Sequence, residues 1–145
     1  MGPSDVVIPV YPVAGAPSNG MTVADALIQE LAAALVTYLR TQRSHVIDLT
    51  CMPLSGEDKE RLDAYLGLGE TSMDIHALLR TRIEETRYAG VWRVRHYGPD
   101  DTVQSERIEV IDVPEIARAS TADIGRSAQR LAAVKGEEGV WQTKP

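Results

Sequence analysis

Apolar residues recur at helical spacing early in the chain. The recurrence follows Thr22 and fades near Arg40 and Arg43, whose cations suit the negative end of a helix dipole. Thr22 and Asp25 have the spacing of a capping box, in which the hydroxyl accepts a hydrogen bond from an unpaired amide. The pattern therefore predicts an amphipathic helix after Thr22. Its apolar positions are Val23, Leu27, Leu31, Ala34, Leu35 and Tyr38.

A short apolar run and a second helix follow. Residues 46–49 read Val-Ile-Asp-Leu, which predicts a short inner strand that Pro53 ends. Ser55 and Asp58 repeat the capping-box spacing and predict a helix that continues to Leu66. Gly67 stands where a helix C-terminus favours a residue with positive φ.

The middle of the chain alternates as strands do. Residues 72–79 alternate and predict one strand, and residues 83–97 predict a single long strand. Gly90 inside the long strand indicates a bulge or a close backbone approach. Residues 98–101 form a turn cluster, so residues 103–113 should return antiparallel to the long strand.

Together these elements predict an α+β domain. Its expected architecture is a mostly antiparallel sheet of about four strands with helices packed on one face. Pro114 ends the last strand, and Ser120 with Asp123 predicts a final helix to about Val134. We expect residues 1–20 to be a Pro/Gly-rich leader or edge segment, residues 21–134 to form a single domain, and residues 135–145 to be a flexible tail.

Composition narrows the classes of function. The chain has 145 residues, a formal net charge of −6 and one cysteine. That charge argues against nucleic acid and against a polybasic membrane contact. One cysteine excludes an internal disulfide and a cysteine-rich metal knuckle. No apolar run has the roughly 20 residues needed to span a bilayer, so we expect a cytoplasmic location.

The strand region 83–113 is unusually rich in charge for a sheet. Two interpretations stay open: solvated cross-strand ion pairs, or a polar docking face anchored by Trp92, because Trp and Arg are favoured at interface hot spots. The position of Gly90 leaves open which charges share a face. The charged residues considered for this face are Glu85, Arg87, Arg93, Arg95, Glu106, Arg107 and Glu109.

The segment 66–72, Leu-Gly-Leu-Gly-Glu-Thr-Ser, also admits two interpretations. It lacks the lysine and the following helix start of a phosphate-binding loop. It is either a helix end followed by a strand start, or a loop that presents Glu70 to a partner.

Metal binding and thiol chemistry are the remaining alternatives. Asp74 and His76 lie two residues apart, on one side of a predicted strand, and are weak candidates for nickel or zinc. Cys51 could act with His45 or His96, yet no oxyanion loop or basic flank accompanies it, so a buried structural thiol is expected. No cofactor is expected.

Several of these segments resemble the C-terminal conserved region of the HupH/HyaF hydrogenase expression family. The resemblance spans roughly residues 47–124, and the order and spacing of its pieces are more specific than any single piece. Thr71 departs from the pattern, which has an apolar residue after Gly-Glu. The pieces are Val-Ile-Asp-Leu at 46–49 with Pro-Leu at 53–54, Leu-Gly-Leu-Gly-Glu at 66–70, Glu-Thr at 85–86 leading to Gly-Val-Trp at 90–92, Ile-Glu at 108–109 and Pro-Glu-Ile at 114–116.

The resemblance implies a non-catalytic accessory role in the maturation of NiFe uptake hydrogenases. It implies a hydrogenase subunit precursor, with the iron–sulfur small subunit as the expected one, and other maturation factors as partners. Edge strands near residues 6–10 or 72–79 also make a homodimer possible. A metallochaperone and a Cys51-dependent enzyme are the alternatives. The expected partner contacts are Glu70, Glu85, Arg87, Trp92, Arg93 and Glu109.

Overall fold

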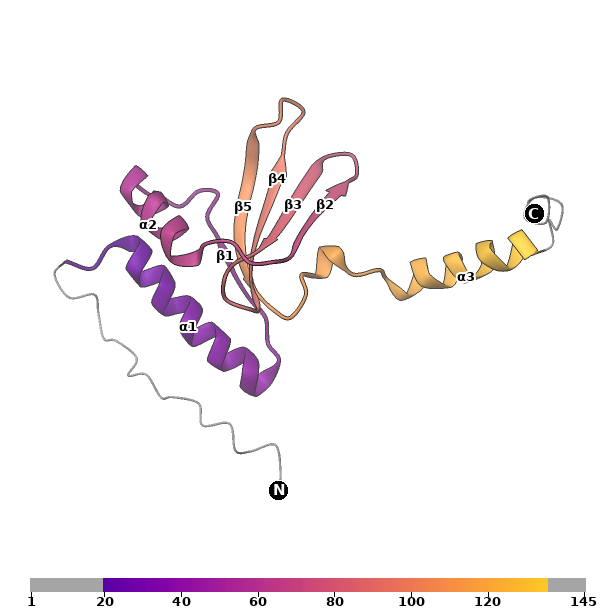
Figure 1. Cartoon of the computed structure of the whole chain (residues 1–145), viewed down its shortest axis with the longest axis horizontal. Coiled ribbons are helices and arrows are strands. Elements are labelled where there is room, and N and C mark those ends of the chain that lie inside the picture. The colour runs from indigo at the N-terminus through magenta and orange to yellow at the C-terminus, as the bar shows by residue number, and fades with distance from the viewer. Residues whose placement is uncertain (1–19, 136–145) are drawn as a thin grey trace, which may run out of the picture. The chain divides into compact units, whose positions relative to one another are not determined.

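The computed structural model describes residues 20–135 (Figure 1). One strand lies between the first two helices, four consecutive strands follow, and a short 3-10 helix and a last α-helix end the described chain. The elements are α1 (Val23–Thr41), β1 (His45–Asp48), α2 (Gly56–Leu66), β2 (Ser72–His76), β3 (Arg80–Glu85), β4 (Val91–Tyr97), β5 (Val103–Val110), η2 (Glu115–Ala117) and α3 (Thr121–Lys135).

The chain divides into two compact units, the first ending at Pro114 and the second beginning at Glu115. The sequence had predicted a single domain over 21–134. Within the second unit, Ser120 caps α3 by accepting a hydrogen bond from the amide of Asp123 at 3.1 Å. The described side chains of α3 are exposed except Val134, which is half-buried, so the helix holds no core residue of its own unit.

The five strands of the first unit form one antiparallel sheet in the order β1-β5-β4-β3-β2 (Figure 1). The central strand β4 pairs with β3 through Arg93 and Glu84, and with β5 through Arg93 and Ile108. These pairs fix which side chains share a face. The α+β fold class is therefore confirmed, with five strands rather than about four.

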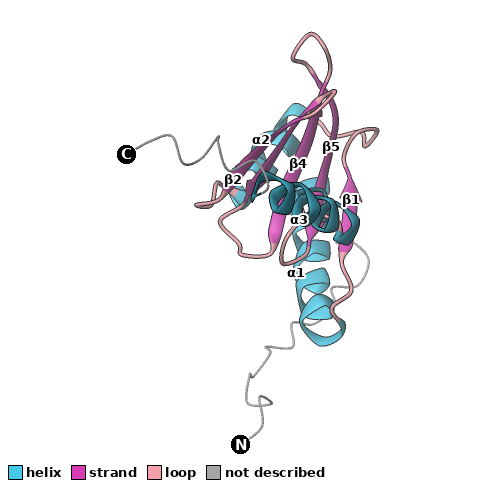
Figure 2. Ribbon diagram, turned by 90° about the vertical axis from the view of Figure 1, so that its right-hand side faces the viewer, coloured by secondary structure: helices cyan, strands magenta, loops and turns pink. Residues whose placement is uncertain are grey.

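Both α1 and α2 lie on the same face of the sheet, and Figure 2 shows them behind the strands. Their apolar sides and the sheet enclose one aliphatic core, as expected for a chain without phenylalanine. Tyr65 of α2 donates a hydrogen bond to Asp25 of α1 at 3.1 Å, which joins the two helices. The core residues are Ala24, Leu27, Leu31, Ala34, Ile47, Leu49, Leu62, Leu66, Val91, Ile108 and Val110.

Local end signals explain where the helices begin and end. Thr22 and Ser55 each form a complete capping box with the aspartate three residues later, as the sequence predicts. Gly67 ends α2 with φ of 56°. A residue with a side chain is strained at that angle, so glycine suits the position.

The predicted long strand over 83–97 is wrong. It is a hairpin, in which β3 ends at Glu85 and β4 begins at Val91. Gly90 has φ of 83° and lies in the turn, where the amide of Thr86 donates to the carbonyl of Val91 at 2.9 Å. The glycine therefore reverses the chain rather than forming a bulge within one strand.

Two other strand predictions also need correction. The strand at 46–49 is not an inner strand, because β1 lies at one edge of the sheet and Val46 is exposed. The strand predicted over 72–79 stops at His76, and β3 begins at Arg80 after a turn. β2 forms the opposite edge of the sheet, so the expectation of an edge strand there is confirmed.

Some expectations fall outside the described residues. The leader, with its possible strand at 6–10, lies in the undescribed segment 1–19, and all of the expected tail but Lys135 lies in 136–145. Within residues 20–135, none of the helices is both long and apolar enough to cross a membrane.

Candidate functional site

The helix-covered face of the sheet is apolar at one end and charged at the other. Ile47 and Ile108 are paired across β1 and β5 and lie in the core under the helices. Arg93 of β4 is the register partner of Ile108, so its side chain is on the same face. It lies at the boundary between the apolar core and the charged side chains. The pairs Arg95–Glu106 and Arg82–Arg95 extend this charged area across β5, β4 and β3.

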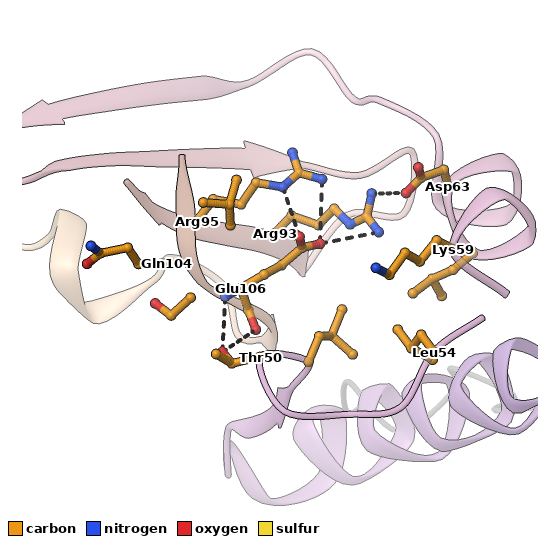
Figure 3. Close-up of a pocket in the computed structure, with 12 residues that line it drawn as sticks. Thr50, Leu54, Lys59, Asp63, Arg93, Arg95, Gln104 and Glu106 are labelled. Carbon is orange, nitrogen blue, oxygen red and sulfur yellow. Dashed lines mark hydrogen bonds and ion pairs between the residues drawn. The ribbon is translucent and has the colours of Figure 1, made fainter. Parts of the chain in front are cut away.

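These charges form one continuous chain of contacts, which we call the ion-pair ladder (Figure 3 shows its β4–β5 end). Glu84 accepts from Arg82 Nε at 3.0 Å and from Arg95 Nη1 at 3.1 Å. Arg95 Nε donates to Glu106 at 3.2 Å, and Glu106 also lies 3.5 Å from Arg93 Nη2. The ladder comprises Asp74, Arg82, Glu84, Arg95, Glu106, Arg93 and Asp63.

The two ends of the ladder reach different elements. At one end Arg93 pairs with Asp63 of α2, so the ladder joins the sheet to a helix. At the other end Asp74 of β2 pairs with Arg82 and accepts from Arg80 Nε at 3.2 Å. Desolvation opposes ionisation of Asp74, yet the Arg80 hydrogen bond and the Arg82 charge together lower its pKa below the usual value.

A pocket of about 330 Å³ opens beside the α2 end of the ladder (Figure 3). Its walls come from the loop after β1, from α2, from the middle of β4 and from the first half of β5. Thr50 holds the loop to β5, because its hydroxyl lies 3.4 Å from the Glu106 carbonyl and accepts from the Glu106 amide at 3.2 Å. The lining combines aliphatic side chains with both signs of charge.

Arg93 is the most buried cation of this region, with an exposed fraction of 8%. Its two terminal nitrogens are paired with Asp63 and Glu106, but its Nε is buried without a hydrogen-bond partner among the described residues. A buried donor without a partner costs about 1–3 kcal/mol. That nitrogen is enclosed by the protein's own atoms and is not open to the pocket.

The structure divides the predicted partner contacts between the two faces. Arg93 lies on the helix-covered face, whereas Trp92 and its register partners Glu85 and Glu109 lie on the opposite face. Glu109 is only 8% exposed and pairs with Arg107 at 2.8 Å. These residues therefore do not form one surface with Arg93.

Trp92 is only 4% exposed, and its indole N–H donates to the carbonyl of Ile111 at 3.0 Å. In this conformation the ring belongs to the chain's own packing. A partner contact by Trp92 stays a prediction that this burial does not favour.

Glu70 and Arg87 lie near the start of β2 and the β3–β4 turn, and both are exposed. The guanidinium of Arg87 lies over Gly67, where an added Cβ would come within 2.6 Å of its Nε. The amide of Gly69 donates to the carbonyl of Glu85 at 2.8 Å. The segment 66–72 thus packs as a connection between α2 and β2 that leaves Glu70 at the surface.

The two candidate metal ligands, Asp74 and His76, have different surroundings in the structure. Asp74 belongs to the ion-pair ladder, so its carboxylate is already paired with two arginines. His76 is exposed two residues further along β2. Among the described residues, no group of three or more His, Cys, Asp and Glu side chains is arranged to hold a metal ion.

Cys51 is exposed, so the expectation of a buried structural thiol is wrong. It lies in the loop after β1, whose neighbours Thr50 and Leu54 line the pocket. The two histidines considered as its partners have other contacts: His45 pairs with Glu30 at 2.7 Å, and His96 Nδ1 lies 2.7 Å from the Thr81 hydroxyl.

Four residues of the pocket and the ladder were not predicted from the sequence. They are Lys59 and Asp63 of α2, and Arg82 and Glu84 of β3. Once the turn at 86–90 is located, alternation places Arg82 and Glu84 on the face of Arg93 and Arg95. That alternation was the available signal. Nothing local in α2 indicates that Lys59 and Asp63 meet the sheet.

A family comparison decides the relationship of this chain to known proteins. The model of the family described as "HupH hydrogenase expression protein, C-terminal conserved region" matches residues 21–137. The chain belongs to this HupH family. The resemblance seen in the sequence is thereby confirmed.

Several HupH relatives carry related names. The chain is 36% identical over 114 residues to the hydrogenase expression/formation protein HupH of Rhodobacter capsulatus, covering 79% of this chain and 41% of that protein. It is 34% identical over 91 residues to the hydrogenase expression/formation protein HupQ of Azotobacter chroococcum mcd 1, covering 63% of this chain and 32% of that protein. The chain thus spans about a third to two-fifths of these relatives' length.

A solved structure shares the fold. The hydrogenase expression protein HupH from Thiobacillus denitrificans ATCC 25259 superposes with a TM-score of 0.75 at 33% identity. The match covers 79% of this chain and 95% of that one. That HupH protein therefore shares this arrangement over most of the present chain.

Proposed function

We propose that this chain is a non-catalytic accessory protein in the formation of a NiFe uptake hydrogenase. In this proposal it binds an immature subunit, the iron–sulfur small subunit, and holds it transiently before assembly. Family membership supports the hydrogenase context, because the relatives are named hydrogenase expression or formation proteins. The choice of the small subunit is the part that the experiment below tests.

The observation that carries a binding role is the ion-pair ladder beside an open pocket. Its side chains are mutually paired and only partly covered: the side chain of Glu84 is 18% exposed and that of Arg82 is 31% exposed. Such a surface is rigid before it meets a partner, so little side-chain entropy is lost on contact. Charged pairs at a partly hydrated surface contribute more to the specificity for a partner than to the binding affinity. This suits a transient complex.

Three of the predicted contacts fit this surface or its exposed surroundings. Arg93 lies in the ladder, and Glu70 and Arg87 are exposed near the end of α2. Glu85, Trp92 and Glu109 lie on the opposite face and are not part of the proposed docking surface. The proposal therefore places the partner against the charged end of the helix-covered face.

Affinity capture in cells that make the hydrogenase tests this proposal. The tagged chain should recover the small-subunit precursor, and Arg82→Ala should recover less, because it removes two contacts of the ladder. Arg40→Ala is the matched control, since it removes one exposed arginine at the end of α1, outside the ladder and the pocket. Recovery of neither hydrogenase subunit by the unmodified chain would refute the proposal.

A further inference from the structure

Strand β2 forms an edge of the sheet that lacks the usual protection against further pairing. Among the residues that the structure describes, it is the last strand of the sheet and pairs with β3 alone (Figure 1). Natural edge strands are commonly protected by proline, by lysine, by a bulge or by very short length. β2 has five residues in continuous register with β3, and its sequence, Ser-Met-Asp-Ile-His, contains neither proline nor lysine. Its free side can therefore accept another strand.

The alternation of hydrogen bonds between β2 and β3 determines which backbone groups of β2 face outward. The amide of Glu85 donates to the carbonyl of Thr71 at 2.9 Å, so these two residues form a hydrogen-bonded pair. Hydrogen-bonded pairs recur at every second residue of an antiparallel ladder, so Met73 and Ile75 also bond to β3. The residues whose amides and carbonyls point away from β3 are Ser72, Asp74 and His76.

The side chains of β2 present different chemistry on the two faces of the sheet. On the face opposite the helices, Met73 and Ile75 are half-buried, and Met73 lies beside the fully buried Ile83 of β3. On the helix-covered face, Asp74 is the end of the ion-pair ladder. A strand that pairs with β2 places its own side chains alternately on these two faces. The matching strand therefore has aliphatic residues beside Met73 and Ile75, separated by one residue that faces Asp74.

The charge of Asp74 argues against a second copy of this chain as the added strand. A two-fold antiparallel pairing that uses all three outward residues places Asp74 opposite Asp74 of the second copy. Centring the pairing on Ser72 places Glu70 opposite Asp74, and centring it on His76 uses Leu78, which lies outside β2. Like charges directly opposite each other destabilise a sheet. The arginines that pair with Asp74 belong to β3, on its other side, and do not separate two such carboxylates.

We infer that the β2 edge binds an extended segment of the hydrogenase subunit precursor as an added strand. The segment forms backbone hydrogen bonds with the outward residues of β2, has no acid opposite Asp74, and packs aliphatic side chains against Met73 and Ile75. Backbone pairing supplies affinity in this mode of recognition, and the alternate side chains supply specificity. The inference rests on the proposed function for the identity of the partner. It continues the proposed docking surface, because Asp74 belongs both to β2 and to the ion-pair ladder.

Amide hydrogen exchange of the nitrogen-15-labelled full chain, followed by NMR for each residue, tests the edge directly. In the dilute free chain the amides of Met73 and Ile75 should exchange slowly, because they bond to β3, and those of the three outward residues should exchange fast. An excess of purified, unlabelled small-subunit precursor should slow the outward amides about tenfold, since each gains a backbone hydrogen bond. These amides are those of Ser72, Asp74 and His76.

Two substitutions of His76 separate the role of its backbone from that of its side chain. His76→Pro removes an outward amide, and proline is tolerated in an edge strand where the N–H faces solvent. It should weaken binding of the precursor about fivefold or more. Slow exchange of Met73 and Ile75 in this variant would confirm that β2 still pairs with β3. His76→Ala keeps the amide and should bind as the unmodified chain does. Equal binding by His76→Pro and the unmodified chain would overturn the inference.

The exchange data also separate this inference from the proposed function. If the precursor binds but the outward amides of β2 exchange as before, the edge inference fails while the proposed function stands. If the precursor does not bind, the proposed function fails and the inference fails with it. Outward amides that already exchange slowly in the dilute free chain, or that become slow when the chain alone is concentrated, would show that this chain or a second copy occupies the edge. Either result would overturn the inference.

Discussion

Trp92 shows how one residue's neighbours decide between a structural and a binding role. Its indole is buried on the face opposite the ion-pair ladder and donates to the carbonyl of Ile111. Trp92→Ala should therefore lower the free energy of unfolding by about 3–5 kcal/mol. Chemical denaturation measures this loss. Tyr88→Ala, at a residue that is 49% exposed, is the control and should cost far less.

Glu106 is the residue on which most of the ladder depends. It pairs with both Arg93 and Arg95, so Glu106→Gln leaves two partly buried guanidinium groups with a weaker partner. We expect a loss of about 1–3 kcal/mol in the free energy of unfolding. Glu57→Gln, whose side chain is 79% exposed, should change stability by less than about 0.5 kcal/mol. Equal effects of the two substitutions would contradict a structural role for the ladder.

The sequence predicts that the sheet carries many charges, but it does not predict which of these charges share a face. The sequence places Arg93 and Arg95 on one face wherever the strand begins, because their side chains are two residues apart. It does not place them relative to Glu85, because the turn at 86–90 lies between. That turn contains no proline, asparagine or aspartate, and Gly90 alone fits a bulge as well as a turn.

Elements with local end signals were predictable, and those that depend on distant partners were not. The caps at Thr22 and Ser55 and the end of α2 at Gly67 follow from the residues themselves. The edge position of β1 does not, because it depends on a pairing with β5 some 60 residues later, such as His45 with Val110. The contact of Asp63 with Arg93 is likewise tertiary.

The connection between α2 and β2 has a testable steric requirement. A Cβ at Gly69 would lie 2.4 Å from the carbonyl oxygen of Thr86, which is backbone and has little freedom to move. Gly69→Ala should therefore lower the melting temperature clearly. Gly56→Ala is the matched control, since a Cβ there meets no atom within 4 Å. A melting temperature of Gly69→Ala as high as that of Gly56→Ala would show that the connection packs differently.

The capping boxes of α1 and α2 predict how stability depends on pH. Hydrogen bonds with Thr22 lower the pKa of Asp25, and hydrogen bonds with Ser55 lower that of Asp58, below the usual 3.8. A lowered folded-state pKa contributes stability that is present above 3.8 and lost as the pH falls below it. Urea unfolding at successive pH values should show this acid loss.

The double variant Asp25→Asn with Asp58→Asn is the control for the pH dependence. It should be less stable than the unmodified chain at neutral pH and should lose less stability on acidification, because two of the titrating groups are gone. An unchanged acid slope would mean that other carboxylates control the transition.

The whole molecule consists of a core unit and a separate C-terminal unit. Every residue of the aliphatic core lies between Ala24 and Val110. A chain of residues 1–119, which ends before α3, should therefore still unfold in a single cooperative transition. A loss of cooperative unfolding would support the single domain over 21–134 that the sequence predicted.

We propose that the charged end of the helix-covered face binds an immature hydrogenase subunit. Carboxyl footprinting of the chain, with and without purified small-subunit precursor, separates the two faces most directly. Asp63, whose side chain is 60% exposed, and Glu106 lie on the proposed face, whereas Glu85 lies on the opposite one. The precursor should protect Asp63 and Glu106 and leave Glu85 unchanged. Protection of Glu85 with Asp63 unchanged, or protection of neither, would contradict it.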